Sequence, residues 1–156
     1  MGVDTAAGSN FYIGPANEVA ATQTAYEALS YVEVGEVTNV SEFGDEANIV
    51  THTALSDRRV RKFKGSYDAG IITLDIGHDS ADTGQVNLDT ALASDSDYAF
   101  KVTADDAGTG SPSSPSTWFF RGKVTSVRTT IGNAENIVML RATIAINSPI
   151  IEVAAV

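Results

Sequence analysis

The sequence has no cysteine and only ten lysine and arginine residues among 156. The missing thiols exclude disulfides, thiolate metal sites and cysteine nucleophiles. The 20 acidic residues give a formal net charge of -10, which argues against a protein that grips nucleic acid, because phosphate contacts require lysine and arginine. No apolar run approaches the ~18 residues of a membrane-spanning helix. Residues 1–8 lack the basic and apolar regions of a secretory signal, so we expect synthesis in a reducing cytoplasm.

The length and hydrophobic content of the chain are sufficient for one domain, residues 1–156. Its hydrophobic content of 43% allows a buried core at this length. Alternating apolar and polar residues predict a mainly β fold, a β-sandwich or partly closed barrel with one flanking α-helix. Residues 1–21 are expected to form an N-terminal arm with a short strand. Residues 22–29 fit one helical turn or a strand equally well.

The stretch 31–79 predicts two long strands, 31–43 and a second that begins near Arg59, joined by a polar excursion. We define 44–64 as an extended charged loop. The apolar alternation shifts phase at Gly35, which predicts a β-bulge there. Further along, Ile72, Leu74 and Ile76 share one face, and Thr73 and Asp75 occupy the other. Burial favours the apolar face as the core side, at roughly 25 cal/mol per Å², so Thr73 and Asp75 are predicted to face solvent.

The second half of the chain predicts a helix followed by further strands. Asp82 and Gln85 fit a capping box, and Gln85, Leu88 and Leu92 fall on one stripe of a short amphipathic helix over 82–94. Strands are expected at 98–103, 118–130 and 137–146, with a glycine-, proline- and serine-rich loop at 105–117. Pro149 is expected to end the last strand, because it has no N–H to donate.

Half of the basic residues are crowded into seven positions: Arg58, Arg59, Arg61, Lys62 and Lys64. The rest of the chain is strongly acidic, and such asymmetry favours self-complementarity, with this basic cluster meeting an acidic neighbour. A solvated strand end explains the same pattern equally well. We carry the cluster forward as the predicted assembly interface.

No catalytic, cofactor-binding or metal-binding residue is predicted, and the chain is not expected to be an enzyme. The acidic group around His78, with Asp75, Asp79 and Asp82, lacks the glycine and glutamate of an EF-hand loop, and a capped turn is the favoured interpretation. The aromatic run 118–120 suits a stacking platform for sugars or bases, but a strand that delivers aromatic side chains to the core is favoured.

The order of these features resembles the tail tube proteins of long-tailed, non-contractile bacteriophages. The resemblance covers about residues 20–153. It rests on the order of these elements and on their residue patterns. It is carried by the strand Tyr31–Phe43, the basic Arg58–Gly65 stretch, the Ile71–Ile76 strand, the 82–94 helix and the Phe119–Val127 hairpin strand. It implies a β-sandwich flanked by one helix, an N-terminal arm and a long hairpin loop.

The resemblance also implies a function: six copies form a ring, and rings stack into a hollow virion tail tube that delivers DNA. The 44–64 loop and the 1–21 arm would reach neighbouring subunits, and tail tip, tape-measure and terminator proteins would be partners. Thr73 and Asp75 would face the bore, whose net negative wall would let DNA slide without specific binding. No membrane contact is implied. Two alternatives are a monomeric β-sandwich that binds carbohydrate or peptide, and a hydrolase that uses two acidic residues.

Overall fold

A computed structural model describes residues 3–156, and its regular structure is mainly β. No helix in this part of the chain is long and apolar enough to span a membrane. The elements are, in chain order, β1 (Asn10–Ala16), α1 (Gln23–Glu27), β2 (Val32–Val34), β3 (Val37–Val40), β4 (Glu46–Thr53), β5 (Val60–Asp68), β6 (Ile71–Gly77), α2 (Thr83–Ala93), β7 (Tyr98–Thr103), β8 (Thr117–Thr130), β9 (Met139–Ile146) and β10 (Ile151–Val153).

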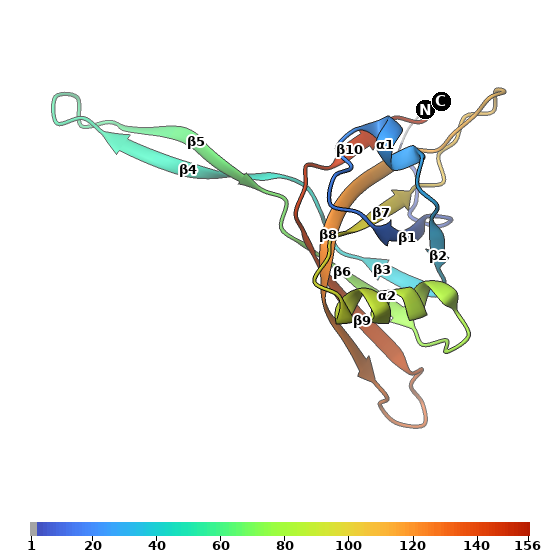
Figure 1. Cartoon of the computed structure of the whole chain (residues 1–156). Helices are drawn as coiled ribbons and strands as arrows, with labels where there is room; N and C mark the ends of the chain where they lie inside the picture. Colours follow the sequence, from blue (N-terminus) through green and yellow to red (C-terminus); the bar gives the residue numbers. More distant parts are fainter. Residues whose placement is uncertain (1–2) are drawn as a thin grey trace.

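Eight of the strands form one antiparallel sheet, and two project from it as a separate hairpin (Figure 1). The sheet order is β2-β1-β7-β8-β9-β6-β3, and β10 pairs with the start of β8. The outermost strands β2 and β3 are joined only by Gly35 and Glu36, so the sheet bends back until its two edges are close. Among residues 3–156 no ladder joins those edges, so the barrel is not closed. The predicted fold class is confirmed.

The main core lies inside this bend. Ile72, Leu74 and Ile76 are fully buried there, which confirms the predicted alternation of β6. Phe100 and Phe120 stack above them with ring centroids 5.4 Å apart. Helix α2 covers the opening of the bend and adds Leu88 and Ala91 to the core; burial of these side chains is the main stabilising term.

A second, smaller core lies on the opposite face of the sheet, beneath α1. Tyr26 of α1 is fully buried and stacks on Phe119 with 5.6 Å between ring centroids. Ala20 and Ala99 complete this cluster. Thr22 caps α1 by accepting a hydrogen bond from the backbone N–H of Ala25. The undecided 22–29 segment is therefore helical, and two helices flank the sheet where one was predicted.

The predicted strand 31–43 is two short strands that pair with different partners. β2 pairs with β1, and β3 pairs with β6 at the other edge of the sheet. The phase shift at Gly35 is therefore a turn between two strands, and the predicted β-bulge is wrong. Glu36 takes a left-handed conformation with φ 60°, and this turn carries the chain from one edge of the sheet to the other within two residues. The second strand of this stretch is interrupted at Ala69 and Gly70, and it forms β5 and β6.

Helix α2 begins at the predicted cap but buries a different stripe. The Asp82 carboxylate accepts hydrogen bonds from the N–H groups of Gln85, 3.0 Å away, and Gly35, 3.1 Å away. The Gln85 side chain accepts from Asp79 N–H and donates to Gly77 O, so it does not complete a capping box with Asp82. The helix buries Gln85, Leu88 and Ala91 and leaves Leu92 40% exposed, so Leu92 was wrongly predicted.

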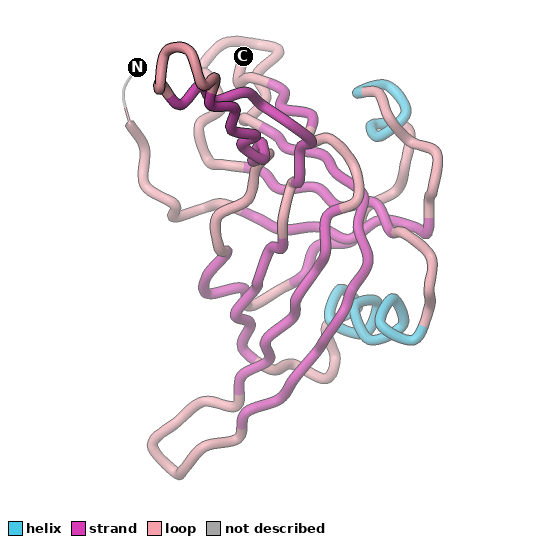
Figure 2. The backbone as a smooth tube through the Cα atoms, turned by 90° about the vertical axis from the view of Figure 1, so that its left-hand side faces the viewer, coloured by secondary structure: helices cyan, strands magenta, loops and turns pink. Residues whose placement is uncertain are grey.

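The C-terminal hairpin matches its prediction, but the chain then adds a strand that the sequence did not indicate. Residues 122–130 of β8 pair with β9, and the loop that connects the two strands extends from the body at the foot of Figure 2. After Pro149 the chain forms β10, where Ile151 pairs with Phe119. β9 ends at Ile146, before Pro149 is reached, and the chain rejoins the sheet after the proline, because β10 pairs with the part of β8 that β9 leaves free.

Much of the expected 1–21 arm is part of the body. β1 lies between β2 and β7, and its Phe11 and Ile13 are buried in the main core. Residues 17–20 are held by Arg121, which donates to Glu18 O at 2.8 Å and to Ala20 O at 2.7 Å. Residues 1–2 fall outside the described part of the chain. Any role as an arm is therefore confined to the residues before β1.

Candidate assembly surface

The β4–β5 hairpin extends far from the sheet as a two-stranded ribbon (Figure 1). Its register places Val50 opposite Phe63 and Thr51 opposite Lys62. The segment predicted as a charged loop is thus mostly paired strand. A two-stranded ribbon in water is marginally stable, and each of its strands has one edge with unpaired backbone groups. The ribbon is therefore a surface suited to pairing with another chain.

The basic cluster occupies the turn and the returning strand of this hairpin. Arg58 closes the turn with φ 53°, and its N–H donates to Ala54 O at 3.2 Å. Arg61 forms an ion pair with Asp57. Within residues 3–156, no carboxylate lies within ion-pair distance of the other four members, which are Arg58, Arg59, Lys62 and Lys64. The structure keeps the cluster together at one exposed end of the molecule.

Apolar side chains accompany these charges on both faces of the ribbon. Val50 and Phe63 pair directly across the strands on one face, and Ile49 and Val60 lie on the other with Lys62 and Lys64. Leu55, at the tip, is fully exposed. The exposed fractions on the strands exceed one half: Ile49 66%, Val50 54%, Val60 54%, Phe63 56% and Tyr67 66%. Exposed apolar side chains gathered on one small element are typical of an interaction surface.

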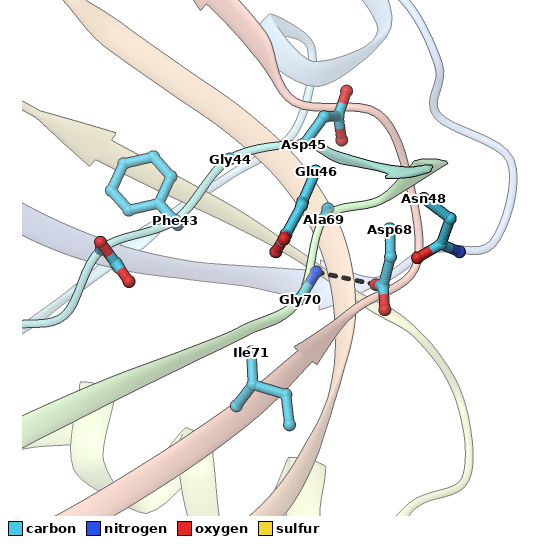
Figure 3. Close-up of a pocket in the computed structure, with 10 residues that line it drawn as sticks. Phe43, Gly44, Asp45, Glu46, Asn48, Asp68, Ala69, Gly70 and Ile71 are labelled. Carbon is cyan, nitrogen blue, oxygen red and sulfur yellow. Dashed lines mark hydrogen bonds between the residues drawn. The ribbon is translucent and has the colours of Figure 1, made fainter. Parts of the chain in front are cut away.

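An acidic cleft lies at the base of the hairpin, where β4 and β5 leave the body (Figure 3). Four carboxylates line it, and none is within 4.0 Å of a cationic group in the described chain. Phe43, Ala69 and Ile71 supply its apolar lining. The four acidic residues are Glu42, Asp45, Glu46 and Asp68. Sequence reasoning missed this cleft, because the hairpin brings residue 68 beside residues 42–46 only after folding.

The face of β6 that was predicted to meet solvent lies opposite the core, and it carries both positive and negative side chains. Asp75 forms an ion pair with Arg141 of the adjacent strand β9. In this pair Arg141 Nε donates a hydrogen bond to the Asp75 carboxylate, 2.9 Å away. Arg128 of β8 lies opposite Arg141 on the same face. Thr73 and Asp75 are half-buried. The local charge of this face is therefore not negative, since one carboxylate faces two guanidinium groups.

The other sequence candidates have structural roles. Asp82 caps α2, and Asp79 accepts from the N–H of Ala81. Asp75 forms an ion pair with Arg141. Among residues 3–156 no three side chains of the metal-binding types lie close enough to hold a metal ion. Phe119 and Phe120 are buried in the two cores, while Trp118 packs edge-on against Phe43. The preferred interpretation of the 118–120 run, aromatic side chains delivered to the core, is confirmed.

Burial shifts the pKa of two side chains that meet over the β1–β7 pair. Lys101 Nζ lies 4.3 Å from the ring centroid of Tyr12 and 5.1 Å from that of Tyr31. Burial lowers the pKa of Lys101, since it disfavours the charged form of an amine. Burial, with a smaller contribution from Tyr26, raises the pKa of Tyr31 above its usual range. The cation–π contact of Lys101 with Tyr12 links β7 to β1.

Comparison with known families settles what kind of protein displays this surface. Residues 1–110 match the model of the phage tail tube protein family, TTP. The chain belongs to this family. As a phage tail tube protein it is a structural component of a virion tail, and its family is not a family of enzymes. The resemblance stated from the sequence is confirmed.

Solved structures support the same fold across the whole chain. The sheath/tube terminator of the PVC extracellular contractile injection system, in the extended state, matches with a TM-score of 0.69 at 13% identity, covering 99% of both chains. A chain of the anti-feeding prophage baseplate matches at 0.67 and 10% identity, covering 99% of this chain and 98% of that one. The SPP1 tail tube matches at 0.63 and 10% identity, covering 94% and 76%. No curated protein matches the chain.

Proposed function

We propose that this tail tube protein assembles with itself into stacked rings of six copies, which enclose the channel for DNA in a long, non-contractile tail. The observation that carries the proposal is the projecting β4–β5 ribbon, with apolar side chains on both faces and four cations that have no carboxylate partner among residues 3–156. An isolated monomer gains nothing from exposing such a surface, whereas burial against a second copy removes apolar area from water.

The basic cluster is the proposed contact with neighbouring copies. Arg58, Arg59 and Arg61, with Lys62 and Lys64, form a cationic end on a protein whose formal net charge is -10. An acidic copy therefore attracts this end of its neighbour and steers the encounter. Proposed further partners are the tail tip, tape-measure and terminator proteins, all made with this chain in the bacterial host cytoplasm.

The polar face of β6, β8 and β9 is proposed to line the bore, with Thr73 and Asp75 directed into it. The apolar side of the same strands is buried in the core, so only the polar side is free to meet solvent inside a ring. Arg141 pairs with Asp75, which leaves Arg128 as the one guanidinium of this face without a carboxylate partner among residues 3–156. The acidic remainder of the protein supplies the repulsion that keeps DNA unbound.

Electron microscopy of the purified chain tests the proposal directly. At raised protein concentration, with or without a tail tip complex as nucleator, we expect rings and hollow tubes with a channel wide enough for duplex DNA. Light scattering on the same samples gives the concentration at which polymer appears. A chain that stays monomeric under all these conditions contradicts the proposal.

A further inference from the structure

The β4–β5 ribbon has a surface that its own molecule does not cover. The cross-strand pair Val50 and Phe63 is exposed on one face, and Ile49 and Val60 are exposed on the other. The segment 54–64 adds five cationic side chains and one carboxylate, Asp57, so its net charge is strongly positive. A partner for this ribbon therefore needs an acidic surface with apolar patches.

The cleft at the hairpin base has that chemistry. It is an open hollow of about 470 Å³, lined by four carboxylates, and Ile71 beside it is 59% exposed. Glu46 and Asp68 lie directly opposite each other across the β4–β5 ladder. Like charges in that position destabilise a strand pair, and no cation of residues 3–156 is near enough to compensate. A cation from outside would relieve this repulsion.

The ribbon cannot place its own basic end in this cleft. Both lie on the same hairpin, and Asp68 is the ninth residue after Arg59, at the far end of the extended strand β5. At roughly 3.3 Å per residue, that distance is about 30 Å along a paired ribbon that cannot fold back on itself. The two complementary surfaces are therefore available only to different copies of the chain.

We propose that the β4–β5 hairpin of one copy docks at the acidic cleft of the next copy, with the basic cluster over Glu42, Asp45, Glu46 and Asp68. This inference rests on the proposed self-assembly and names the surface that receives the hairpin. The ribbon and the cleft are different patches, so the contact is head-to-tail, and every copy both gives a hairpin and receives one. Such a contact repeats without limit unless it closes into a ring.

Charge reversal with complementation tests the pairing. One variant carries Arg59→Glu, Lys62→Glu and Lys64→Glu, which makes the hairpin tip net negative. A second carries Glu42→Lys, Asp45→Lys and Glu46→Lys, which makes the cleft net positive. All six side chains are exposed, so both monomers should fold, as circular dichroism and thermal melts will verify. A control, Asp89→Lys with Glu135→Lys and Glu152→Lys, raises the total charge by as much as the cleft variant does, at exposed sites outside both surfaces.

Each reversed variant alone should require at least about tenfold more protein to polymerise, because like charges then meet across the contact. The equimolar mixture should polymerise near the wild-type concentration, since each variant's hairpin then meets a cleft of opposite sign. The control should behave like the wild type.

Other outcomes overturn the pairing: polymer formed normally by either variant alone, two folded variants whose mixture stays unassembled, or a control that is equally blocked. A wild-type chain that never polymerises instead contradicts the proposed self-assembly itself. The two failures are therefore distinguishable in one set of scattering and microscopy measurements.

Discussion

Two neighbouring residues position α2 over the core: Gly84 and Gln85. Gln85 is a buried polar side chain whose amide binds backbone groups of Gly77 and Asp79, so its burial is compensated. Gly84 faces β2 so closely that a Cβ atom there would lie 2.3 Å from Glu33 O. The helix therefore approaches the strand backbone to a distance that only glycine permits.

Substitution of Gly84 tests this contact. Alanine in a helix is normally favoured over glycine by about 1 kcal/mol, but here its Cβ meets backbone atoms that cannot move aside. We expect Gly84→Ala to lower the free energy of unfolding by about 1–3 kcal/mol in urea titrations. Gly110→Ala, where a Cβ has no neighbour within 4 Å, is the matched control and should stay within about 0.5 kcal/mol of the wild type. Equal effects would contradict the close approach.

Asp106 makes the 105–117 loop sensitive to acid. Its carboxylate accepts hydrogen bonds from Ser116 Oγ at 2.6 Å and Ser116 N at 2.7 Å, which lower the pKa of Asp106 below its usual value. A lowered pKa means that these bonds favour the folded loop above the ordinary carboxyl pKa of 3.8 and are lost as pH falls through the folded value. In an NMR titration, Ser116→Ala should raise the pKa of Asp106, and Ser113→Ala should leave it in place. An unchanged pKa in Ser116→Ala would refute the assignment.

At the scale of elements, the hairpin and the core sheet use apolar residues for opposite purposes. Phe120 of β8 is fully buried, whereas Phe63 of β5 is 56% exposed on a ribbon without a core of its own. Both lie on strands, so the strand pattern alone does not distinguish them. The difference is whether a second layer covers the strand, and within residues 3–156 no second layer covers the ribbon.

This contrast predicts two distinct phenotypes. Phe63→Ser should change the free energy of unfolding of the monomer by less than about 0.5 kcal/mol, because the Phe63 side chain is mostly exposed and makes few contacts that the substitution would remove. The same variant should strongly reduce polymer formation in light scattering. Phe120→Ala, the comparison in the core, should cost about 3–5 kcal/mol of stability. A Phe63 variant that destabilises the monomer and polymerises normally would show that the ribbon serves the monomer's fold.

At the scale of the whole molecule, the bend of the sheet separates two surfaces. The core side is closed by α2, and the hairpin carries the basic cluster far from the body (Figure 1). The remaining polar face of β6, β8 and β9 carries Asp75, Arg128 and Arg141 and is free for the bore. The surfaces proposed for assembly and for the lumen therefore occupy different parts of one small domain.

The bore assignment predicts the effect of reversing Asp75. Asp75→Lys removes the partner of Arg141 and leaves three cations together, so phosphate should bind there. We expect rings and tubes to form, since the hairpin is unchanged, but genome release from particles with this variant should be slower. Thr73→Ser, which keeps the charge, is the control. Normal release kinetics, or a tube structure with Asp75 on its outer wall, would contradict the assignment.

Local rules in the sequence determined several parts of this protein. The period of two placed Ile72, Leu74 and Ile76 in the core, because alternate side chains of a strand must face the same layer. The start of α2 could be predicted from Asp82, because an N-cap side chain accepts hydrogen bonds from backbone N–H groups only a few residues further along the chain. The cluster of five basic residues and the order of elements were enough to identify the tail tube family.

Only the tertiary structure decided which distant segments pair. It placed β1 in the body, split residues 31–43 between the two edges of the sheet, and added α1 and β10. It also brought Asp68 opposite Glu46, creating the acidic cleft from residues that are 22 positions apart. Strand partners are selected by packing and by free edges across the whole chain, and no local pattern encodes that choice. The cleft, which the basic cluster is proposed to bind, therefore exists only in the folded molecule.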